Sequence, residues 1–532
     1  MKRKRLAIIG CGSSGLICLK YALDELSDWE IVCYEATSDI TGCWGNPPPG
    51  FVSTSTKYTT QFACHRQYDA NVTRDVNSSD RKVRYSDFFV DDEYGRYLEG
   101  FAARFQLHSH IIRNCTVGRV DRLRDGDWQL TVEKDSRQST ELFSSVVICT
   151  GLANAVRPLD CSIETLRTLD PETPVSGKTI VVIGGGESGV DMADRLAKPE
   201  LKNVVYLSLR TGIRVSPRYH PIRGVPSDFL RNRLMLSIHQ DIRNAIGQKF
   251  VEFRIRSQEI LERIFPSRAK RSESMALDAV AKRKFWSLKL TQTAKDRLFN
   301  MFHNKSDDFL DAVGEGRITI VGDNVDNTYR VYRPFDNDRE TISIEPELIV
   351  PAIGFQTNLE KLSGDQLTLS DFYLSCSHVD YDNIFLIGYT RPIIGNIPSI
   401  SEMQARYVCG LISGRVTRPA DIREQHESIR TELKHSYSQI NIDQVYPVEM
   451  FPYCDKLARQ MGCYPSRKQV GSFTRWVRVM LSPASTLHYF DDGLTNVKAT
   501  TEPIHAPLLV TLFLLTVRIF DIIYRFAVRR SD

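Results

Sequence analysis

The chain of 532 residues lacks the signatures of several common protein classes. Its 12 cysteines include no pair separated by two residues, and none has a spacing to histidine that is typical of a zinc site. A dithiol reductase is therefore excluded, and we expect no metal site. The formal net charge is only +4, so the composition gives no reason to expect a nucleic-acid partner. Scattered cysteines of this kind favour a reducing compartment.

Long apolar segments are also scarce. The basic start, Met1–Arg5, is followed by an apolar run that ends at Gly10, which is too short for a signal peptide. Near the other end, residues 508–517 form an uninterrupted run of only ten mostly apolar residues. A spanning helix needs about 20. We expect residues 507–528 to form an apolar helix at a membrane surface, in which Arg518 and Asp521 pair one turn apart. A helix docked on the globular body is the alternative.

Two glycine-rich turns, each preceded by an apolar strand, are the clearest motifs that the sequence contains. Residues 6–15 read LAIIGCGSSG and residues 180–189 read IVVIGGGESG. In a Rossmann-like unit, the first glycine permits the tight turn, the second lets the backbone approach a pyrophosphate, and the third allows close helix packing. The following helix attracts the anion through its free N–H groups. We therefore expect two dinucleotides, at turns formed by Gly10, Gly12 and Gly15 and by Gly184, Gly186 and Gly189.

The residues that follow each turn differ in charge. Twenty residues after Gly15, the strand-like run 30–35 ends at Glu35, whose carboxylate can accept hydrogen bonds from ribose hydroxyls. The strand after the second turn, residues 203–208, has no acid at its end and runs into Arg210. A guanidinium binds a 2′-phosphate, whereas a carboxylate repels it. The first site is thus predicted to bind FAD and the second NADPH rather than NADH, with a solvated loop cation as the alternative for Arg210.

The order of the strands predicts an α/β protein with two Rossmann-like dinucleotide-binding domains. Each has a return strand, at residues 145–151 and 347–355. We expect the NADP-binding domain to be inserted into the FAD-binding domain. The predicted boundaries are 1–159 and 335–450 for the FAD domain, 160–334 for the NADP domain with a helical insertion at about 226–314, 451–506 for a C-terminal extension, and 507–528 for the apolar helix.

These motifs together resemble the flavin-containing monooxygenases, the family that oxygenates nitrogen and sulfur centres. The resemblance covers nearly the whole chain and includes ITGCW at 40–44, FVSTSTK at 51–57, CTG at 149–151 and PSISEMQAR at 398–406. It implies FAD contacts at Gly10, Cys11, Gly12, Ser13, Ser14, Glu35, Cys43, Trp44, Thr54 and Ser55. It implies NADP contacts at Ser53, Thr54, Ser188, Gly189, Val190 and Asp191, and it places Glu402 and Gln404 near the flavin ring. The apolar tail matches the members bound to the endoplasmic reticulum, with the catalytic body facing the cytosol; a cytoplasmic protein is the alternative.

Three departures mark a divergent member. The Phe-x-Gly-x-x-x-His fingerprint before the second turn is missing, the family's active-site asparagine is replaced by Thr54, and the return strand reads AIGF at 352–355. The resemblance implies an NADPH-dependent enzyme that forms a C4a-hydroperoxyflavin and transfers one atom of O2 to nitrogen or sulfur of a small organic substrate. Thr54 is the predicted catalytic residue. A Baeyer–Villiger or carbon-hydroxylating enzyme, an NADPH oxidase and a membrane-tethered protein without turnover are the alternatives.

Overall fold

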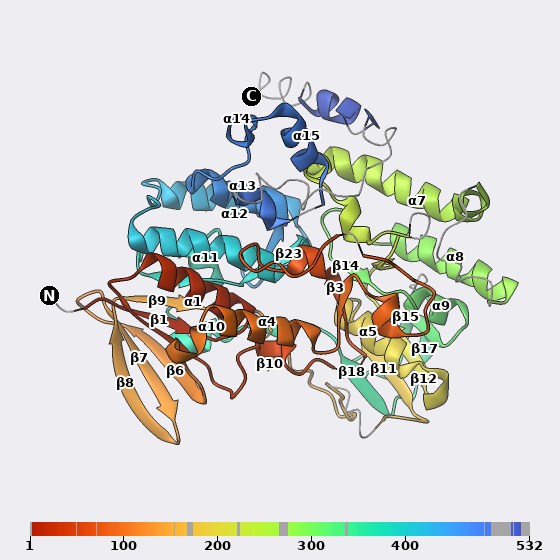
Figure 1. Ribbon diagram of the computed structural model, residues 1–532. Helices are drawn as coiled ribbons and strands as arrows, with labels where there is room; N and C mark the ends of the chain where they lie inside the picture. Colours follow the sequence, from red (N-terminus) through yellow and green to blue (C-terminus); the bar gives the residue numbers. More distant parts are fainter. Residues whose placement is uncertain are drawn as a thin grey trace.

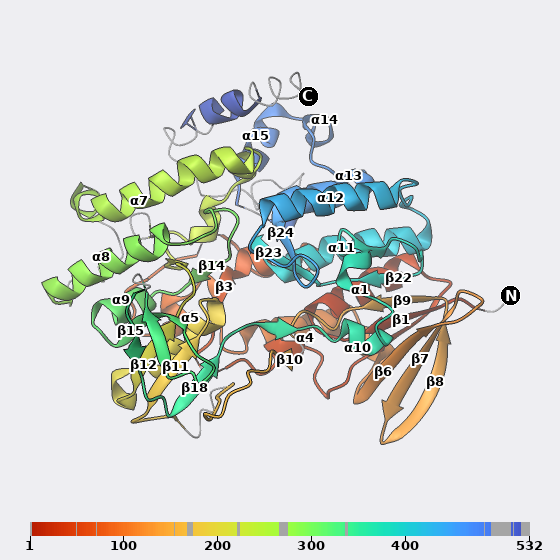
Figure 2. The ribbon, with the colours of Figure 1, turned by 180° about the vertical axis from the view of Figure 1, so that it is seen from behind.

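The computed structural model describes residues 3–48, 50–70, 72–153, 155–167, 174–220, 224–264, 275–335, 339–483, 485–490, 512–513 and 515–522. Two units with parallel sheets lie side by side, and Figure 1 shows them at the lower left and lower right. Helices cover both units from above in the same view, and Figure 2 shows the arrangement from behind. This architecture confirms the prediction of an α/β protein with two Rossmann-like sheets.

The first unit is built on a seven-stranded sheet in the order β20-β21-β22-β9-β1-β2-β5. Its central strands are apolar and almost entirely buried, as is typical of a parallel sheet covered on both faces. Helix α1 (Ser13–Glu25) packs against α11 (Ile397–Ser413), which comes from the other end of the chain. The strands are β1 (Arg5–Ile9), β2 (Glu30–Tyr34), β5 (Ile111–Ile112), β9 (Ser145–Ile148), β20 (Phe372–Tyr373), β21 (Ser377–His378) and β22 (Ile384–Leu386).

The second unit is built on a six-stranded sheet in the order β17-β16-β15-β12-β11-β18. The predicted domain boundary at residue 334 falls inside this sheet, because β18 runs parallel to β11 with Ile180 opposite Leu348. The return strand thus closes the second unit and does not start the next one. The elements are β11 (Thr179–Ile183), α5 (Glu187–Leu196), β12 (Val204–Ser208), α9 (Phe309–Gly314), β15 (Ile318–Asn324), β16 (Val331–Pro334), β17 (Ile342–Ser343) and β18 (Leu348–Pro351).

The chain passes from the first unit to the second and back through two adjacent segments. These segments form a short antiparallel ladder between β10 (Ala155–Val156) and β19 (Phe355–Gln356), in which Ala155 lies opposite Gln356. Arg157 strengthens the ladder, because its Nε donates to the carbonyl of Phe355 at 3.2 Å. The second unit is therefore inserted into the first.

The remaining elements surround the two sheets. Strand β3 (Val52–Thr56) pairs with β4 (Phe88–Val90) and leads into α2 (Lys57–Thr60), while α3 (Arg81–Arg84) and α4 (Glu93–Arg104) follow. A three-stranded sheet, β6 (Cys115–Arg122), β7 (Trp128–Lys134) and β8 (Arg137–Phe143), extends from the first unit (Figure 1). Helix α10 (Leu359–Ser363) packs against β6. The other elements of this part of the chain are β23 (Thr390–Ile394), α12 (Ile422–Ser436), β24 (Tyr446–Glu449), α13 (Met450–Gln460), α14 (Arg467–Val470) and α15 (Phe473–Leu481).

The region predicted as a helical insertion, residues 226–314, contains two long helices. These are α7 (Gln240–Ile264) and α8 (Leu277–Gln292), and they extend beyond the second sheet in Figures 1 and 2. The short helix α6 (Arg233–Leu236) precedes them. The region also contributes β14 (His303–Lys305), which pairs in parallel with β13 (Arg214–Ser216) and was not expected from the sequence.

The described residues of the C-terminal helix, 512–513 and 515–522, lie against the start of α7. Asp521 is completely buried, accepts a hydrogen bond from the backbone N–H of His239 at 3.2 Å, and pairs with Arg518 as predicted. Arg518 also donates to the carbonyl of Ser237 at 2.7 Å. No helix within the described ranges is both long and apolar enough to cross a membrane. Residues 507–511, 514 and 523–528 of the predicted helix lie outside the described residues.

Candidate dinucleotide sites

The first glycine-rich turn has the geometry that a pyrophosphate requires. Gly10 has φ of +93°, and a Cβ there would lie 3.0 Å from the carbonyl oxygen of Cys149. A Cβ at Gly15 would lie 1.9 Å from the carbonyl oxygen of Gly10, so only glycine allows α1 to start this close to β1. Gly12 is the N-cap of α1 and provides no side-chain cap. The first N–H groups of α1 therefore suit an anion.

Two further segments predicted from the sequence lie beside this turn. The Glu35 carboxylate, at the end of β2, accepts a hydrogen bond from the N–H of Cys11 at 2.8 Å and from the hydroxyl of Thr37 at 2.9 Å. A carboxylate in this position fits an adenosine ribose. The loop that contains Cys43 and Trp44 also reaches the turn, because a Cβ at Gly42 would lie 3.2 Å from the Cα of Gly12. The residues present therefore fit FAD.

The two serines of the first turn are buried at the start of α1. The hydroxyls of Ser14 and Ser401 lie 2.9 Å apart in a hydrogen bond that joins α1 to α11. Ser13 is 8% exposed and Ser14 is 7% exposed. The Ser14 hydroxyl thus joins the two helices.

The second turn repeats this geometry and leaves more space. Gly184 has φ of +114°, and a Cβ there would lie 2.3 Å from the carbonyl oxygen of Ala352. A Cβ at Gly189 would lie 2.0 Å from the carbonyl oxygen of Gly184, whereas a Cβ at Gly186 would meet nothing within 4 Å. Gly186 is the N-cap of α5, again without a side-chain cap. The open space over Gly186 and the free N–H groups fit a second pyrophosphate.

Arg210 follows β12 and is exposed at the edge of this second site. Within the described ranges it has no salt-bridge partner, so its guanidinium is available for a 2′-phosphate. Arg214, four residues later, differs from it: it is buried, and its Nε lies 3.2 Å from the sulfur of Met301. Burial lowers the pKa of Arg214 to about 10. Arg210 rather than Arg214 therefore fits the predicted role.

Several residues that the resemblance assigned to the cofactors have other partners. The Val190 side chain packs in the core of the second unit, and its N–H donates to the carbonyl of Gly186 at 3.0 Å. Asp191 forms a salt bridge with Arg195 at 2.8 Å on the outer face of α5. Of this group, Ser188 is exposed at the first turn of α5. Val190 and Asp191 thus have partners within the second unit, and their contacts with NADP stay a prediction.

Glu402 and Gln404 on α11 are likewise used inside the first unit. The Glu402 carboxylate accepts hydrogen bonds from the N–H groups of Ala63 at 2.7 Å and Cys64 at 3.1 Å. Gln404 accepts from the N–H of Gly388 at 2.9 Å and donates to the hydroxyl of Tyr453 at 2.8 Å. Both side chains thus stabilise the fold within the first unit, and a contact of Glu402 or Gln404 with FAD stays a prediction.

Strand β3, which carries Ser53, Thr54 and Ser55, lies between the two units. The Ser53 hydroxyl donates to the carbonyl of Ser55 at 2.7 Å and accepts from the N–H of Phe89 at 3.0 Å. Thr54 and Ser55 are half-buried. Among the described residues, the Thr54 hydroxyl has no hydrogen-bond partner, so it is available to a ligand at the junction of the units.

No sequence motif indicates the charged residues that surround β3. Arg218 follows β13, whereas Asp228, in η4 (Ser227–Leu230), and Lys305, in β14, lie in the insertion that we predicted only as helical. They are separated from β3 by more than 160 residues in sequence. In a sequence, a buried charged residue outside a motif looks the same as a charged residue in solvent. Only the structure therefore identifies Arg218, Asp228 and Lys305.

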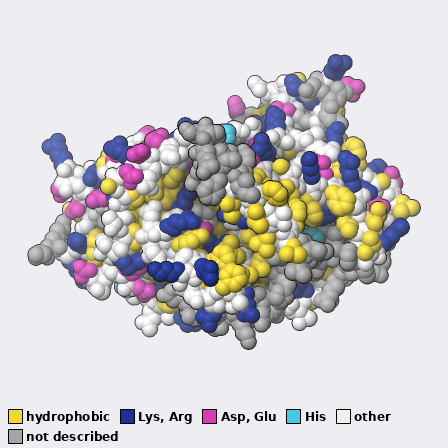
Figure 3. All heavy atoms as spheres, turned by 90° about the horizontal axis from the view of Figure 1, so that it is seen from above, with side chains coloured by type: hydrophobic (Ala, Val, Ile, Leu, Met, Phe, Trp, Pro, Cys, Tyr) yellow, Lys and Arg dark blue, Asp and Glu magenta, His cyan; other side chains and the backbone are white. Residues whose placement is uncertain are grey.

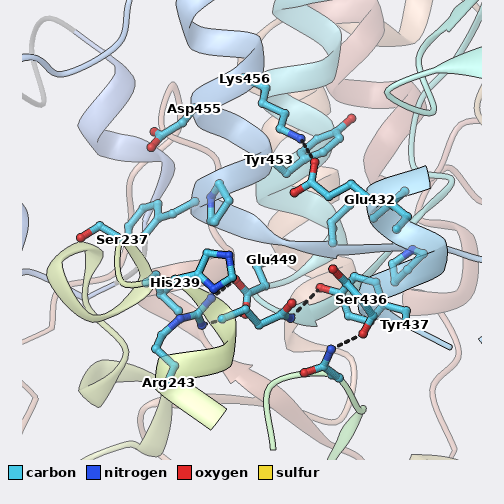
Figure 4. Close-up of a pocket in the computed structure, with 18 of the residues that line it drawn as sticks. Ser237, His239, Arg243, Glu432, Ser436, Tyr437, Glu449, Tyr453, Asp455 and Lys456 are labelled. Carbon is cyan, nitrogen blue, oxygen red and sulfur yellow. Dashed lines mark hydrogen bonds and ion pairs between the residues drawn. The ribbon is translucent and has the colours of Figure 1, made fainter. Parts of the chain in front are cut away.

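A cavity of about 890 Å³ lies elsewhere, between the start of α7, the end of α12 and α13 (Figure 4). Neither glycine-rich turn contributes to its lining. Two charged pairs contribute to its lining: the buried Arg243 binds Glu449 through two hydrogen bonds of 2.8 and 2.6 Å, and the more exposed Glu432 pairs with Lys456 at 3.4 Å. This cavity is therefore separate from the dinucleotide sites.

Comparison with known proteins agrees with this geometry. Residues 3–268, which are 266 of the 532 residues, match the family described as FMO-like, flavin-binding monooxygenase-like. A 4-hydroxybenzoate brominase (decarboxylating) of Marinomonas mediterranea is 26% identical over 501 residues, covering 87% of this chain and 84% of the relative. Human flavin-containing monooxygenase 5 is 24% identical over 558 residues, covering 96% of this chain and 94% of the relative.

Solved structures show the same fold. The closed crystal structure of cyclohexanone monooxygenase superposes with a TM-score of 0.56 at 17% identity, covering 86% of this chain and 97% of that chain. The complex of OTEMO with FAD and NADP also gives a TM-score of 0.56, at 15% identity, covering 85% of this chain and 97% of that chain. The chain belongs to the flavin-binding monooxygenase-like family and is an FAD- and NADPH-dependent monooxygenase.

Proposed function

We propose that the first turn holds FAD, that the second holds NADPH, and that the enzyme transfers one oxygen atom from O2 to a nucleophilic nitrogen or sulfur of a small organic substrate. The observation that carries this proposal is the pair of turns, each open to an anion, in two sheets joined around β3. Among the relatives, a chimpanzee protein named dimethylaniline monooxygenase [N-oxide-forming] 2 is 24% identical over 496 residues. Its name supports nitrogen as the acceptor.

The chain's own residues have positioning roles in this proposal. When bound, the two cofactors supply hydride transfer and the activation of oxygen. The free N–H groups at the starts of α1 and α5 hold the two pyrophosphates, and Glu35 and Arg210 select the two adenosine ends. Thr54, whose hydroxyl has no hydrogen-bond partner in the described part of the chain, can donate a hydrogen bond to an oxygen atom at the junction of the units. No general acid or base is required.

A Baeyer–Villiger reaction is the second candidate. The observation that favours it is the fold shared with cyclohexanone monooxygenase over 86% of this chain. The two candidates differ in acceptor, because a ketone carbon is electrophilic whereas an amine or a thioether is nucleophilic.

One experiment separates these candidates. NADPH consumption by the FAD-loaded protein is measured with amines, thioethers and ketones, and hydrogen peroxide is measured in parallel. Oxidation of an amine or thioether with little peroxide supports the proposal, whereas lactone or ester formation from a ketone supports the second candidate. NADPH consumption that yields only peroxide with every substrate identifies an oxidase and contradicts both.

We also propose that the face carrying α7, α15 and the C-terminal helix rests on a membrane surface. Figure 3 shows this face, where apolar side chains lie among basic ones. The exposed apolar residues include Phe250, Phe253 and Ile260 on α7, Phe473 on α15, and Phe513, Ile519 and Phe520 of the C-terminal helix. Such a surface suits interfacial binding. Co-sedimentation with vesicles of anionic phospholipid tests this proposal, and recovery in the supernatant at low salt contradicts it.

A further inference from the structure

Side chains of the nicotinamide-binding unit and its insertion hold strand β3 at both ends. At the first end, Arg218 donates from Nη2 to the carbonyl of Val52 at 2.7 Å and from Nε to the carbonyl of Ser53 at 3.0 Å. Asp307 fixes Arg218 in turn, by accepting from its backbone N–H at 3.0 Å and from Nη1 at 3.3 Å. All of these groups are buried or nearly so.

At the other end of β3, Asp228 is the acceptor. Its Oδ2 accepts hydrogen bonds from the N–H of Thr56 at 3.0 Å, the hydroxyl of Thr56 at 3.1 Å and the hydroxyl of Thr59 at 3.0 Å. Its Oδ1 lies 3.6 Å from Nζ of Lys305, whose side chain is only 6% exposed. Burial opposes the charge of Asp228, but Lys305 and these donors outweigh it and hold the pKa of Asp228 below its usual range.

Strand β14 extends this set of contacts to the second glycine-rich turn. Asn304, the neighbour of Lys305, donates from Nδ2 to the carbonyl of Gly185 at 2.8 Å. Asn304 is 2% exposed, and its Oδ1 is a buried oxygen without a partner among the described residues. Successive side chains of a strand point to opposite sides. One residue of β14 therefore contacts the NADPH turn, and the next contacts the carboxylate that holds β3.

We propose that Asp228 and Lys305 are positioning residues that couple the second turn to β3, and so set the distance between the nicotinamide and the flavin side of the site. This inference rests on the proposed function. The physical reason is that a buried ion pair fails as a unit: loss of one member leaves the other charge uncompensated. Asp228 binds Thr56, which is two residues from Thr54. A shift of the Asp228–Lys305 ion pair would therefore also move Thr54, in the part of β3 that faces the cofactors in our proposal.

The test uses the FAD-loaded, full-length protein. The variants are Asp228→Asn, Lys305→Met and the double variant, and the readout is the rate at which NADPH bleaches the flavin without oxygen. We expect each single variant to keep its FAD and to be reduced at least tenfold more slowly, while the dissociation constant for NADPH changes less than threefold. In the double variant, which has no uncompensated charge, the rate recovers to within threefold of the unaltered protein.

The exposed pair Asp278 and Lys282 on α8, 2.8 Å apart, is the matched control, and its neutralisation should leave the bleaching rate unchanged. The coupling is wrong if the decrease in bleaching rate in the double variant is the product of the decreases in the two single variants. It is also wrong if NADPH bleaches the single variants at the normal rate. If a single variant loses FAD, Thr56→Val and Thr56→Ser are compared instead. Slow bleaching in Thr56→Val and a normal rate in Thr56→Ser support the coupling. Equal rates in these two variants contradict it. If NADPH fails to bleach even the unaltered protein, the proposed function falls, and the coupling falls with it.

Discussion

The carboxylate of Glu402 accepts a hydrogen bond of 2.7 Å from the backbone N–H of Ala63, 339 positions earlier in the chain. Glu402 is completely buried, and it also accepts from the N–H of Cys64. In Glu402→Gln, an amide NH2 would face one of these N–H donors and leave it unpaired, at a cost of about 1–3 kcal/mol. We expect a lower Tm, measured by thermal unfolding, and weaker retention of FAD. Glu424→Gln, on the exposed side of α12, is the control. An unchanged Tm with an altered flavin spectrum would mean that Glu402 contacts the flavin.

Two glycines of the second turn should respond differently to alanine. At Gly186 a Cβ meets no atom within 4 Å, so Gly186→Ala should fold normally, but its methyl group occupies the space predicted for the pyrophosphate. We expect the KM for NADPH to rise at least tenfold. At Gly189 a Cβ would lie 2.0 Å from a carbonyl oxygen, so Gly189→Ala should lower the Tm and the soluble yield. A Gly186→Ala enzyme with a normal KM would exclude the pyrophosphate from this turn.

Arg210 should determine the choice between NADPH and NADH. Because its guanidinium is exposed beside the second turn, Arg210→Ala should remove the contact with the 2′-phosphate and leave binding of the remainder of the molecule intact. We expect the ratio of kcat/KM for NADPH to that for NADH to fall at least tenfold. Arg124→Ala, in the loop between β6 and β7, serves as the control. An unchanged ratio would mean that Arg210 is a solvated loop residue that does not contact the 2′-phosphate.

Thr54→Ala should release more hydrogen peroxide per NADPH consumed, measured together with the oxygenated product. The predicted cause is loss of the Thr54 hydroxyl, which lacks a hydrogen-bond partner among the described residues. Thr54→Ser keeps the hydroxyl and should behave like the unaltered enzyme. If all three proteins give the same ratio of peroxide to product, Thr54 has no role in the reaction.

His488 should make stability depend on pH. It is 1% exposed, both ring nitrogens lack partners within the described ranges, and burial together with Arg233 lowers its pKa from 6.5 to about 3. The folded protein thus keeps the ring neutral while the unfolded chain takes up a proton below pH 6.5. Stability therefore falls as the pH decreases from 6.5 towards 3, by up to about 1.4 kcal/mol per pH unit. In His488→Leu, the difference in Tm between pH 7.5 and pH 5.0 should be smaller; an equal difference would exclude His488 as its source.

The sequence was sufficient for the parts of the fold that depend on local backbone geometry. Gly10, Gly184 and the apolar strands before them predicted both turns, because close packing leaves no alternative to glycine there. Glu35 was also placed correctly beside its turn. The hydrogen-bond partners of Glu402 and Gln404 could not be predicted, because a helix has several faces and these partners include residues 63, 64 and 453, far away in sequence.

The predicted boundary at residue 334 falls inside the second sheet for a similar reason. An apolar strand such as β18 has the same pattern in either sheet, and only its pairing with β11 assigns it to the second one. The contacts of Asp228 with Thr56 and Lys305 join three segments that are far apart in the chain. A single sequence contains no pattern that predicts such contacts.

The ladder between β10 and β19 has a consequence for the history of the molecule. Because Ala155 lies opposite Gln356, the entry to the inserted unit and the exit from it are neighbours, and the first sheet is complete without it. A segment whose two ends meet can be exchanged as a cassette without disturbing its host. If the two units hold NADPH and FAD as we propose, the donor of reducing power and its acceptor belong to modules that evolution, or a protein engineer, can recombine, provided that the contacts with β3 are rebuilt.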